Sequence, residues 1–429
     1  MTDTASPPCD ILILGAGAAG LMAALEASAP DKTGLAPRVT VADAAPVAGR
    51  KMRLAGGGMG NLTNLHIGPE WYVGDDPAFV RPALRRFPPR AALGLFERYG
   101  LHWEEREYGQ IFGLQPMARL VEAMVADASA RGVRLCFGLR AHKAVRTGQG
   151  LFAVSCVAHT DGRPVELVAR RIILALGSPA WPSCGATDAG LALARGFGHK
   201  CVPFRPVLTP LLLPDRHPLR GLQGISVEVG FDAGPQRLVR PLLFTHRGIS
   251  GPAGLIASCY WRPGQELRVD FLPGTPLRDT LDTPACARLT ARGLLRRLLT
   301  ARLADALETL LWQDFARQGT PAPDTGAHLA QWSRPQRAVL CETVHNLRLV
   351  PTGSEGMARA EAAAGGVRTA GVDARTLESR LTPGLYLAGE LLDVTGLLGG
   401  FNLHWALASG QAAGLAARRA ILAAAGAAC

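Results

Sequence analysis

Three glycines near the N-terminus form the clearest chemical pattern in the sequence. Gly15, Gly17 and Gly20 have the G-x-G-x-x-G spacing that allows a tight turn and a close approach of the backbone to a pyrophosphate. Alone this spacing is weak evidence, because a plain βα turn can be glycine-rich. Here an apolar run at 10–14 precedes it and a helix-forming run follows. The sequence therefore predicts a dinucleotide site at a helix N-terminus, where free N–H groups favour phosphates.

An acidic residue stands where the ribose of a dinucleotide would need one. A second expected strand, 38–42, ends in Asp43, which lies 23 residues beyond Gly20. An acid near that distance holds a ribose hydroxyl in this type of fold. The sequence thus supplies two parts of one nucleotide site.

Two further glycine-rich stretches could contact a flat ligand. Residues 56–64 contain four glycines and two asparagines, which predicts a loop whose backbone is open to contact; a flexible surface loop is the alternative. Near the C-terminus, Gly400–Asn402 opens a helix that continues through Ala420. This second helix N-terminus could stabilise negative charge.

Two histidines are candidate proton donors. His404 and His246 have the residue type whose proton exchange suits neutral pH, although a structural or surface histidine is the more common case. Tyr108 is a weaker candidate. Asp393 fits either a ligand or a turn residue, and we leave that choice open.

Composition limits the class of protein. The 429 residues predict two to three domains, and no apolar run reaches the roughly 18 residues of a membrane span. The N-terminus lacks the pattern of a signal peptide, so a cytoplasmic location is expected. The nine cysteines form no C-x-x-C pair, and no metal site is expected. The net charge of +11 is spread along the chain, so we expect a small-molecule substrate and no nucleic-acid partner.

The predicted secondary-structure pattern changes twice along the chain. Strand and helix patterns alternate up to about Phe204, where short β-like runs separated by Pro and Gly begin. A Leu/Arg amphipathic region follows at 285–319. An α/β pattern returns with the strand 385–390. This order predicts an α/β domain that is interrupted by an insertion.

Together these stretches resemble the BaiN/RdsA (YhiN-like) family of NAD(P)/FAD-dependent flavoproteins. The motifs that carry the resemblance are, in order, DILILGAGAAG, GRKMRLAGGGMGNLTN, ILALGSPAWP, FTHRGISGPAG and GLYLAGELLDVTGLLGGFNLHWALASGQAAG. The resemblance implies an α/β fold with a discontinuous Rossmann-like FAD-binding domain (1–205 and 352–429). It also implies an inserted β-barrel-like domain (206–283 and 343–351) and a helical subdomain (284–342).

The resemblance also implies which residues contact FAD. Its pyrophosphate, ribose, adenine, ribityl and isoalloxazine contacts would be Gly15, Gly17, Ala18, Ala19, Gly20, Asp43, Ala44, Gly49, Arg50, Lys51, Gly57, Gly58, Asn61, Thr63, Asn64, Val145, Leu176, Gly177, Gly389, Glu390, Gly400, Phe401 and Asn402. The chain departs from the family pattern at Met59, Gln110 and His404, which affects substrate recognition more than FAD binding.

The implied activity is that of an FAD-dependent oxidoreductase. Hydride would pass between flavin N5 and a small organic substrate, with NAD(P)H as a transient electron donor, because the chain has no second G-x-G-x-x-G unit. One alternative is an oxidase that releases hydrogen peroxide. A second alternative is an RNA-associated flavoprotein, which the basic charge would favour.

Overall fold

The computed structural model describes residues 8–426, which form two compact units. Within the described residues, unit 1 comprises 8–206 and 361–426, and unit 2 comprises 207–360. Unit 1 is therefore discontinuous in sequence, as predicted. The chain returns to it at residue 361 rather than 352, because β18 (Gly353–Ser354) still pairs with β12 (Leu211–Leu212) of unit 2.

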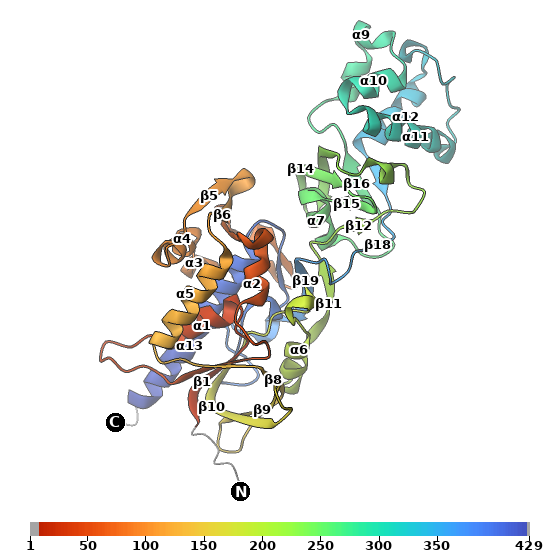
Figure 1. The fold of residues 1–429 in the computed structure, drawn as a ribbon. Coiled ribbons are helices and arrows are strands. Elements are labelled where there is room, and N and C mark those ends of the chain that lie inside the picture. Colours follow the sequence, from red (N-terminus) through yellow and green to blue (C-terminus); the bar gives the residue numbers. More distant parts are fainter. Residues whose placement is uncertain (1–7, 427–429) are drawn as a thin grey trace. The chain divides into compact units, whose positions relative to one another are not determined.

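A parallel sheet forms the centre of unit 1 (Figure 1). Its parallel strands lie in the order β7, β2, β1, β10, with β20 pairing beside the second half of β10. Their apolar residues are almost fully buried, as expected for a sheet that is covered on both faces. The strands are β1 (Cys9–Leu14), β2 (Val39–Asp43), β7 (Arg134–Phe137), β10 (Pro164–Leu174) and β20 (Leu385–Leu387).

Strand β10 joins two kinds of sheet. Its first half pairs antiparallel with β9 (Phe152–Ala158), which pairs with β8 (Leu139–Arg146). Its second half pairs parallel with β1 and β20. β10 is nevertheless one continuous strand, and its buried or partly buried apolar residues run from the first half into the second.

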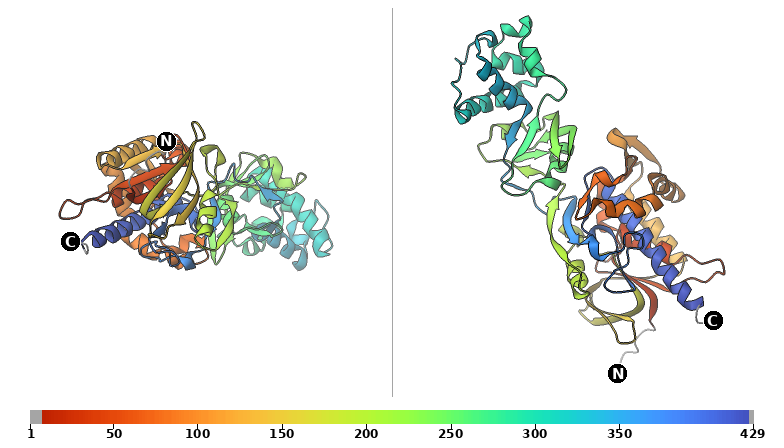
Figure 2. Two further views of the ribbon diagram at one scale, coloured as in Figure 1. Left: turned by 90° about the horizontal axis from the view of Figure 1, so that it is seen from below. Right: turned by 180° about the vertical axis from the view of Figure 1, so that it is seen from behind.

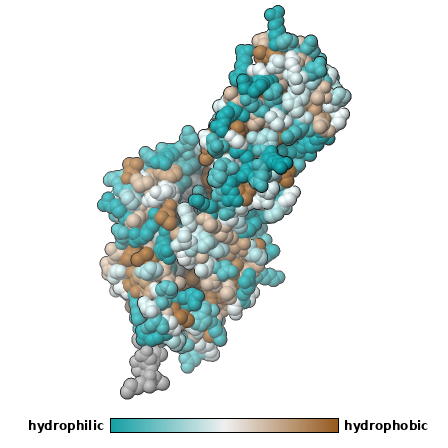
Figure 3. All heavy atoms as spheres, turned by 45° about the vertical axis from the view of Figure 1, so that its right-hand side comes forward, coloured by the Kyte–Doolittle hydropathy of each residue, from teal (hydrophilic) through white to brown (hydrophobic). Residues whose placement is uncertain are grey.

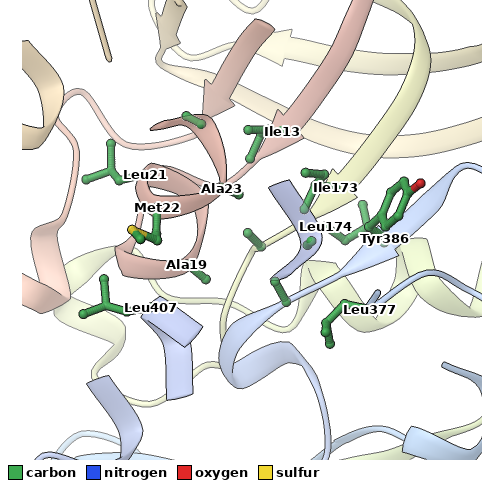
Figure 4. Close-up of a cluster of buried hydrophobic side chains, with 14 of the residues drawn as sticks. Ile13, Ala19, Leu21, Met22, Ala23, Ile173, Leu174, Leu377, Tyr386 and Leu407 are labelled. Atoms are coloured by element: carbon green, nitrogen blue, oxygen red, sulfur yellow. The ribbon is translucent and has the colours of Figure 1, made fainter. Parts of the chain in front are cut away.

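Two helices that are far apart in sequence pack in parallel on this sheet. In α1 (Ala18–Ala27) and α13 (Phe401–Gly426), Gly410 lies on Ala19 and Gly414 on Ala23. A Cβ at either glycine would collide with a backbone carbonyl oxygen of α1. Figure 4 shows Ala19, Met22 and Leu407 in a buried hydrophobic cluster that also contains Ile13 and Ile173 of the sheet. The contact fixes the direction of both helices.

The parallel packing places the two helix N-termini at different heights. Gly410 lies beside the first turn of α1, but α13 begins at Phe401, more than two turns earlier. At 1.5 Å per residue, α13 extends about 12 Å beyond the start of α1. Both N-termini point in the same direction.

The remaining elements of unit 1 surround this core. The helices are α2 (Arg50–Leu54), α3 (Arg81–Arg86), α4 (Pro89–Arg98), α5 (Met117–Ala130) and α6 (Ala189–Gly196). The strands are β3 (Asn61–Asn64), β4 (Tyr72–Gly74), β5 (Trp103–Arg106), β6 (Gln110–Gly113), β11 (Cys201–Val207), β19 (Ala362–Val367) and β21 (Val394–Gly396). The short 3₁₀ helices are η1 (Ala55–Gly58), η2 (Pro69–Trp71), η3 (Pro77–Val80), η4 (Glu107–Gly109), η5 (Pro182–Cys184), η8 (Thr369–Gly371) and η9 (Gly389–Leu391).

Unit 2 contains an antiparallel sheet and a group of helices (Figures 1 and 2). The strand order is β17, β16, β13, β14, β15, β12, β18, and within the unit helices α9 to α12 gather at one end. The further strands are β13 (Ser226–Ala233), β14 (Gln236–Phe244), β15 (Gly248–Ser250), β16 (Leu267–Asp270) and β17 (Leu347–Leu349). The helices are η6 (Pro218–Leu222), α7 (Gly251–Tyr260), α8 (Leu277–Leu281), α9 (Pro284–Ala287), α10 (Ala291–Leu298), α11 (Ala301–Gln318), η7 (Leu329–Gln331) and α12 (Arg334–His345).

Within residues 8–426, no helix is both long enough and apolar enough to cross a bilayer. The longest helix, α13, has polar and basic residues among its small ones.

The contact between α1 and α13 can be tested with a single methyl group. We expect Gly410→Ala to lower the free energy of unfolding by about 1–3 kcal/mol, because the added Cβ has no room against Ala19. Gly94→Ala is the matched control, since Gly94 also lies inside a helix but has nothing within 4 Å of an added Cβ. The control should gain up to about 1 kcal/mol. Urea denaturation measures both, and equal stability of the two variants would contradict the packing described.

Candidate functional site

The predicted cofactor residues follow the ends of four parallel strands. Gly15 follows β1, Asp43 ends β2, Leu176 and Gly177 follow β10, and Gly389 follows β20. These strand ends lie along the carboxyl edge of one sheet, which is where open α/β sheets bind ligands. The structure thus brings together residues from both ends of the sequence.

The first glycine turn has the geometry of a phosphate-binding turn. A Cβ on Gly15 would collide with the carbonyl of Ala175, and a Cβ on Gly20 would collide with the carbonyl of Gly15. These two glycines allow close backbone packing. Gly17 differs, because it has ordinary dihedral angles and nothing lies within 4 Å of an added Cβ. As N-cap of α1 it has no side chain, so the first N–H groups of the helix receive no side-chain cap.

The carboxylate of Asp43 is fixed by hydrogen bonds from the backbone, one of them from the glycine turn. Its carboxylate accepts hydrogen bonds from the backbone N–H of Ala16 (2.6 Å) and of Ala45 (2.7 Å). Burial raises its pKa above the ordinary value, while these two N–H groups and the charge of Arg50 act in the opposite direction. The carboxylate is therefore fixed beside the glycine turn. Ala44, the next residue, is exposed.

Lys51 and Glu390 form an ion pair across the sequence. The Nζ of Lys51 lies 2.7 Å from Oε2 of Glu390, and Oε1 of Glu390 accepts a hydrogen bond from the N–H of Ala363 at 2.9 Å. One carboxylate thus ties together α2, β19 and η9. The guanidinium of Arg50 instead donates to the carbonyl oxygen of Ser183 at 3.0 Å, so it connects α2 to the loop after β10.

Gly389 is positioned by α13. Its N–H donates to Oγ of Ser409 (2.9 Å), and the indole N–H of Trp405 donates to its carbonyl (3.1 Å). The sequence analysis assigned no role to Ser409 or Trp405. The signal available was their spacing of four residues, which puts both on one face of the helix.

The second helix N-terminus packs on a small three-stranded sheet. A Cβ on Gly400 would collide with the carbonyl of Thr63 in β3, and β3 pairs with β6. Asn402 closes the preceding turn, since its side chain accepts from the N–H of Gly396 (2.8 Å) and donates to the carbonyl of Gly396 (3.0 Å). The ring of Phe401 stacks on Trp71 at 5.6 Å between centroids. The start of α13 is therefore held from both sides.

The predicted loop at 56–64 is a loop only in its first part. Gly56 and Gly57 have positive φ, and no atom lies within 4 Å of a Cβ added at Gly57. Gly58 also has positive φ. Residues 61–64 form strand β3, in contrast to the prediction, because they pair with β6, a strand about 50 residues further along the chain. The side chain of Asn64 adds to this pairing, since it donates to the carbonyl of Tyr108 and accepts from the N–H of His66.

One buried polar atom near the start of α13 has no hydrogen-bond partner among the described residues. It is Oδ1 of Asn61, while Nδ2 of the same side chain donates to Gln110 at 3.2 Å. Buried polar atoms are rarely left unsatisfied. Together with the N–H groups of the α13 N-terminus, this atom fits the polar edge of a heterocyclic ligand.

His404 has the environment of a structural histidine, in contrast to its predicted catalytic role. It is fully buried, and burial lowers its pKa to about 4. Its Nε2 lies 2.7 Å from the carbonyl oxygen of Phe87, which can only accept, so Nε2 carries the proton. Its Nδ1 then accepts from the hydroxyl of Thr63 at 2.7 Å. No ring nitrogen is left to reach a substrate, and we assign His404 to the support of Thr63.

Two other predicted residues are not joined to this set. His246 lies exposed between β14 and β15 of unit 2. Val145 lies on β8 with 42% of its surface exposed, at the edge of the sheet rather than at the ends of the parallel strands. Gly49, in contrast, starts α2, and its N–H donates to the carbonyl of Ala16 in the glycine turn.

The parallel sheet and the glycine turn at its carboxyl edge define the class of fold, which is a Rossmann-type nucleotide-binding domain. The sequence matches the family described as HI0933-like protein Rossmann domain over residues 9–416. The chain belongs to this family.

Named relatives span nearly the whole chain. It is 32% identical over 412 residues to a ribosomal RNA dihydrouridine synthase of Haemophilus influenzae, covering 95% of this chain and 98% of that protein. It is 33% identical over 422 residues to a 3-dehydro-bile acid delta(4,6)-reductase of Clostridium scindens, covering 94% and 98%. Its fold is similar to that of a 3-ketosteroid-delta4-(5alpha)-dehydrogenase from Rhodococcus jostii (TM-score 0.52, 15% identity, 97% and 98% covered).

The burial of His404 makes a prediction about stability in acid. A histidine whose pKa is lowered by folding binds its proton more tightly in the unfolded chain, so it lowers stability as the pH falls below about 6.5. We expect this one residue to remove about 2 kcal/mol of stability between pH 7 and pH 5. His404→Gln, whose amide can keep both hydrogen bonds, should lose correspondingly less over that interval. Urea unfolding at the two pH values measures the difference, and parallel losses in both proteins would contradict the assignment.

Proposed function

We propose that the carboxyl edge of the unit 1 sheet binds FAD along the line between the two helix N-termini. The pyrophosphate would lie at Gly15, Gly17 and Gly20, with the N–H groups of α1, and Asp43 would hold the adenosine ribose. Three observations support the fit: the open side of Gly17, the unpartnered Oδ1 of Asn61, and the offset of about 12 Å between the two helix starts.

The remaining contacts follow from this placement. Lys51 and Glu390 would face the ribityl chain, because they lie on elements that flank the glycine turn. Gly57, Gly58 and Asn64 would lie beside the isoalloxazine, and Gly400–Asn402 would stabilise negative charge on its pyrimidine side. Ala18, Ala19, Ala44, Gly49, Arg50, Thr63, Leu176, Gly177 and Gly389 would complete the set through backbone or packing contacts.

The reaction we propose is reduction of a carbon–carbon double bond conjugated to a carbonyl group. The uracil ring of uridine and a delta(4,6) 3-keto steroid share this feature, and the names of two relatives refer to reactions on such compounds. Bound FAD would supply hydride from its reduced N5. The chain would orient the substrate and deliver a proton. NAD(P)H would serve as a transient electron donor.

The proposal that α1 binds the pyrophosphate can be tested at Gly17. We expect Gly17→Val to weaken FAD binding at least 100-fold, because the side chain would occupy the open space beside the first N–H groups of α1. The apoprotein should keep its melting temperature within about 2 °C, since Gly17 has ordinary φ and no close neighbour. Gly148→Val, at another open position, is the control. Flavin titration and thermal melting distinguish the outcomes, and undiminished binding would count against the site.

The electron donor can be identified by anaerobic reduction of the bound flavin. We expect NADH or NADPH to bleach the flavin absorbance bands and an enone to restore them. Bleaching by an organic substrate alone, followed by peroxide release in air, would instead identify an oxidase. A protein that takes up no flavin at all would refute the proposed function.

An RNA substrate is the second candidate function, and the dihydrouridine synthase relative favours it. The face of unit 2 in Figure 3 is largely hydrophilic. Several of its arginines are already paired with acids, such as Arg292 and Arg296 with Asp305. Binding of a ribosomal RNA fragment between 50 and 200 mM salt, with its mass before and after reaction, tests this candidate. A mass gain of two hydrogens would support it, and absence of binding at 50 mM would refute it.

A further inference from the structure

The small sheet of β5, β6 and β3 carries a row of polar side chains on one face. Arg106 of β5 pairs in register with Gln110 of β6, and Gln110 pairs with Asn64 of β3. Residues that stand opposite each other in an antiparallel sheet project to the same face, with their Cβ atoms about 5 Å apart. The next residue of β6, Ile111, projects to the other face and is fully buried. The polar row therefore lies on the face that does not pack into the core.

Two glycine segments of the candidate site lie against this polar face. A Cβ on Gly399, in the turn before α13, would lie 3.2 Å from Cγ of Gln110 and 3.4 Å from Nδ2 of Asn64. A Cβ on Gly56 would lie 3.2 Å from the ring of Phe112, which is two residues beyond Gln110 on β6. Under the proposed function, the residues that follow each of these glycines border the isoalloxazine, the reacting part of FAD. The polar face is therefore beside that part of the site.

The carboxamide of Gln110 is held in one orientation. Its Oε1 accepts a hydrogen bond from Nδ2 of Asn61 at 3.2 Å. Its Nε2 makes no hydrogen bond within residues 8–426 and is not among the buried atoms, because the side chain is only half-buried. The two N–H groups of this amide are thus fixed in direction and available to a ligand.

The guanidinium of Arg106 is fixed on the same face. It lies over the ring of Phe112, with 4.1 Å between its Cζ and the ring centroid. Its Nε and Nη2 both lie 2.7 Å from Oε1 of Glu104. Its Nη1 makes no hydrogen bond in the described part of the chain. Ring stacking and the contact with the carboxylate restrain this guanidinium while one of its nitrogens stays available.

These two side chains match the charge that develops in the proposed reaction. When hydride adds to an alkene that is conjugated to a carbonyl group, the π electrons move to the carbonyl oxygen, and an enolate forms. Donors that are already fixed in place stabilise such a developing oxyanion. The nitrogens of Gln110 and Arg106 can donate but cannot accept, so they suit an oxygen that gains negative charge.

We propose that Arg106 and Gln110 bind the carbonyl oxygen of the substrate and stabilise the enolate. This inference rests on the proposed function and names the residues that recognise its substrate. The alkene gains a hydride from the reduced flavin at the carbon distant from the carbonyl, and its π electrons pass to the oxygen. A proton from water then adds at the neighbouring carbon, and the carbonyl re-forms. Two C–H bonds replace the π bond, with two-electron oxidation of the bound flavin.

The first test measures recognition of an oxyanion without turnover. A phenolate carries a charged oxygen on a planar carbon frame, as an enolate does, and it does not accept hydride. In equilibrium dialysis of 4-nitrophenol at pH 5 and pH 9, we expect the FAD-loaded protein to bind the ionised form at least tenfold more tightly than the neutral form. Equal affinity for the two forms would overturn the proposal.

Variants assign this preference to the polar face. Arg106→Met should reduce it to less than threefold, and Arg106→Lys should restore it in part, because the charge remains while the planar donors are lost. Gln110→Glu should abolish it, because a carboxylate repels the phenolate. Arg98→Met is the matched control, since Arg98 is exposed and lies over the ring of Tyr99 at 5.2 Å. An equal loss in Arg98→Met and Arg106→Met would indicate non-specific attraction and overturn the proposal.

The second test divides the reaction into two halves. In Arg106→Met, flavin reduction by NAD(P)H should stay within twofold of wild type, while anaerobic reoxidation by cyclohex-2-enone should slow about 100-fold. The melting temperature should stay within about 2 °C, because Arg106 is exposed. Unchanged reoxidation would overturn the proposal. If the wild type does not reduce this probe, the dialysis decides; if it takes up no FAD, the proposed function fails, while dialysis of the protein as isolated still tests the oxyanion site.

Discussion

The close parallel contact between α1 and α13 is the constraint on which the rest of unit 1 depends. It requires that Gly410 and Gly414 have no side chains where they meet the carbonyls of Ala19 and Ala23. Once α13 lies there, Ser409 and Trp405 hold Gly389 at the end of β20. The start of α13 then reaches β3, where Gly400 packs on Thr63. The C-terminal helix α13 thus packs on α1, the helix that directly follows the N-terminal glycine turn.

Charge in this site is arranged by the same convergence. A helix N-terminus favours negative charge, and unit 1 contributes two of them. Lys51 adds a compact positive charge, which Glu390 pairs at 2.7 Å. Because the other carboxylate oxygen of Glu390 accepts from the N–H of Ala363, this one side chain ties Lys51, which precedes the insertion, to β19, which follows it.

The polar groups near the second helix start fall into two types. His404 is satisfied at both ring nitrogens, so it contributes rigidity rather than chemistry. Asn61 keeps one buried oxygen without a partner among the described residues. A structural residue and a ligand-binding residue differ in whether their polar atoms already have hydrogen-bond partners. A buried donor or acceptor that is already paired within the protein is not free to bind a ligand.

The sequence by itself determined the class of fold and the first part of the site. The G-x-G-x-x-G spacing, the acid at Asp43 and the α/β pattern interrupted after about residue 205 depend on local conformation and periodicity, which one segment carries alone. It did not determine that 61–64 is a strand, that β10 is one strand, or that His404 is fully enclosed. These depend on partners far away in sequence, such as Phe87 for His404. The tertiary structure alone joined Lys51, Glu390 and Ala363, because ionic and hydrogen-bonding contacts depend on distance in space, and no spacing along the chain encodes that distance.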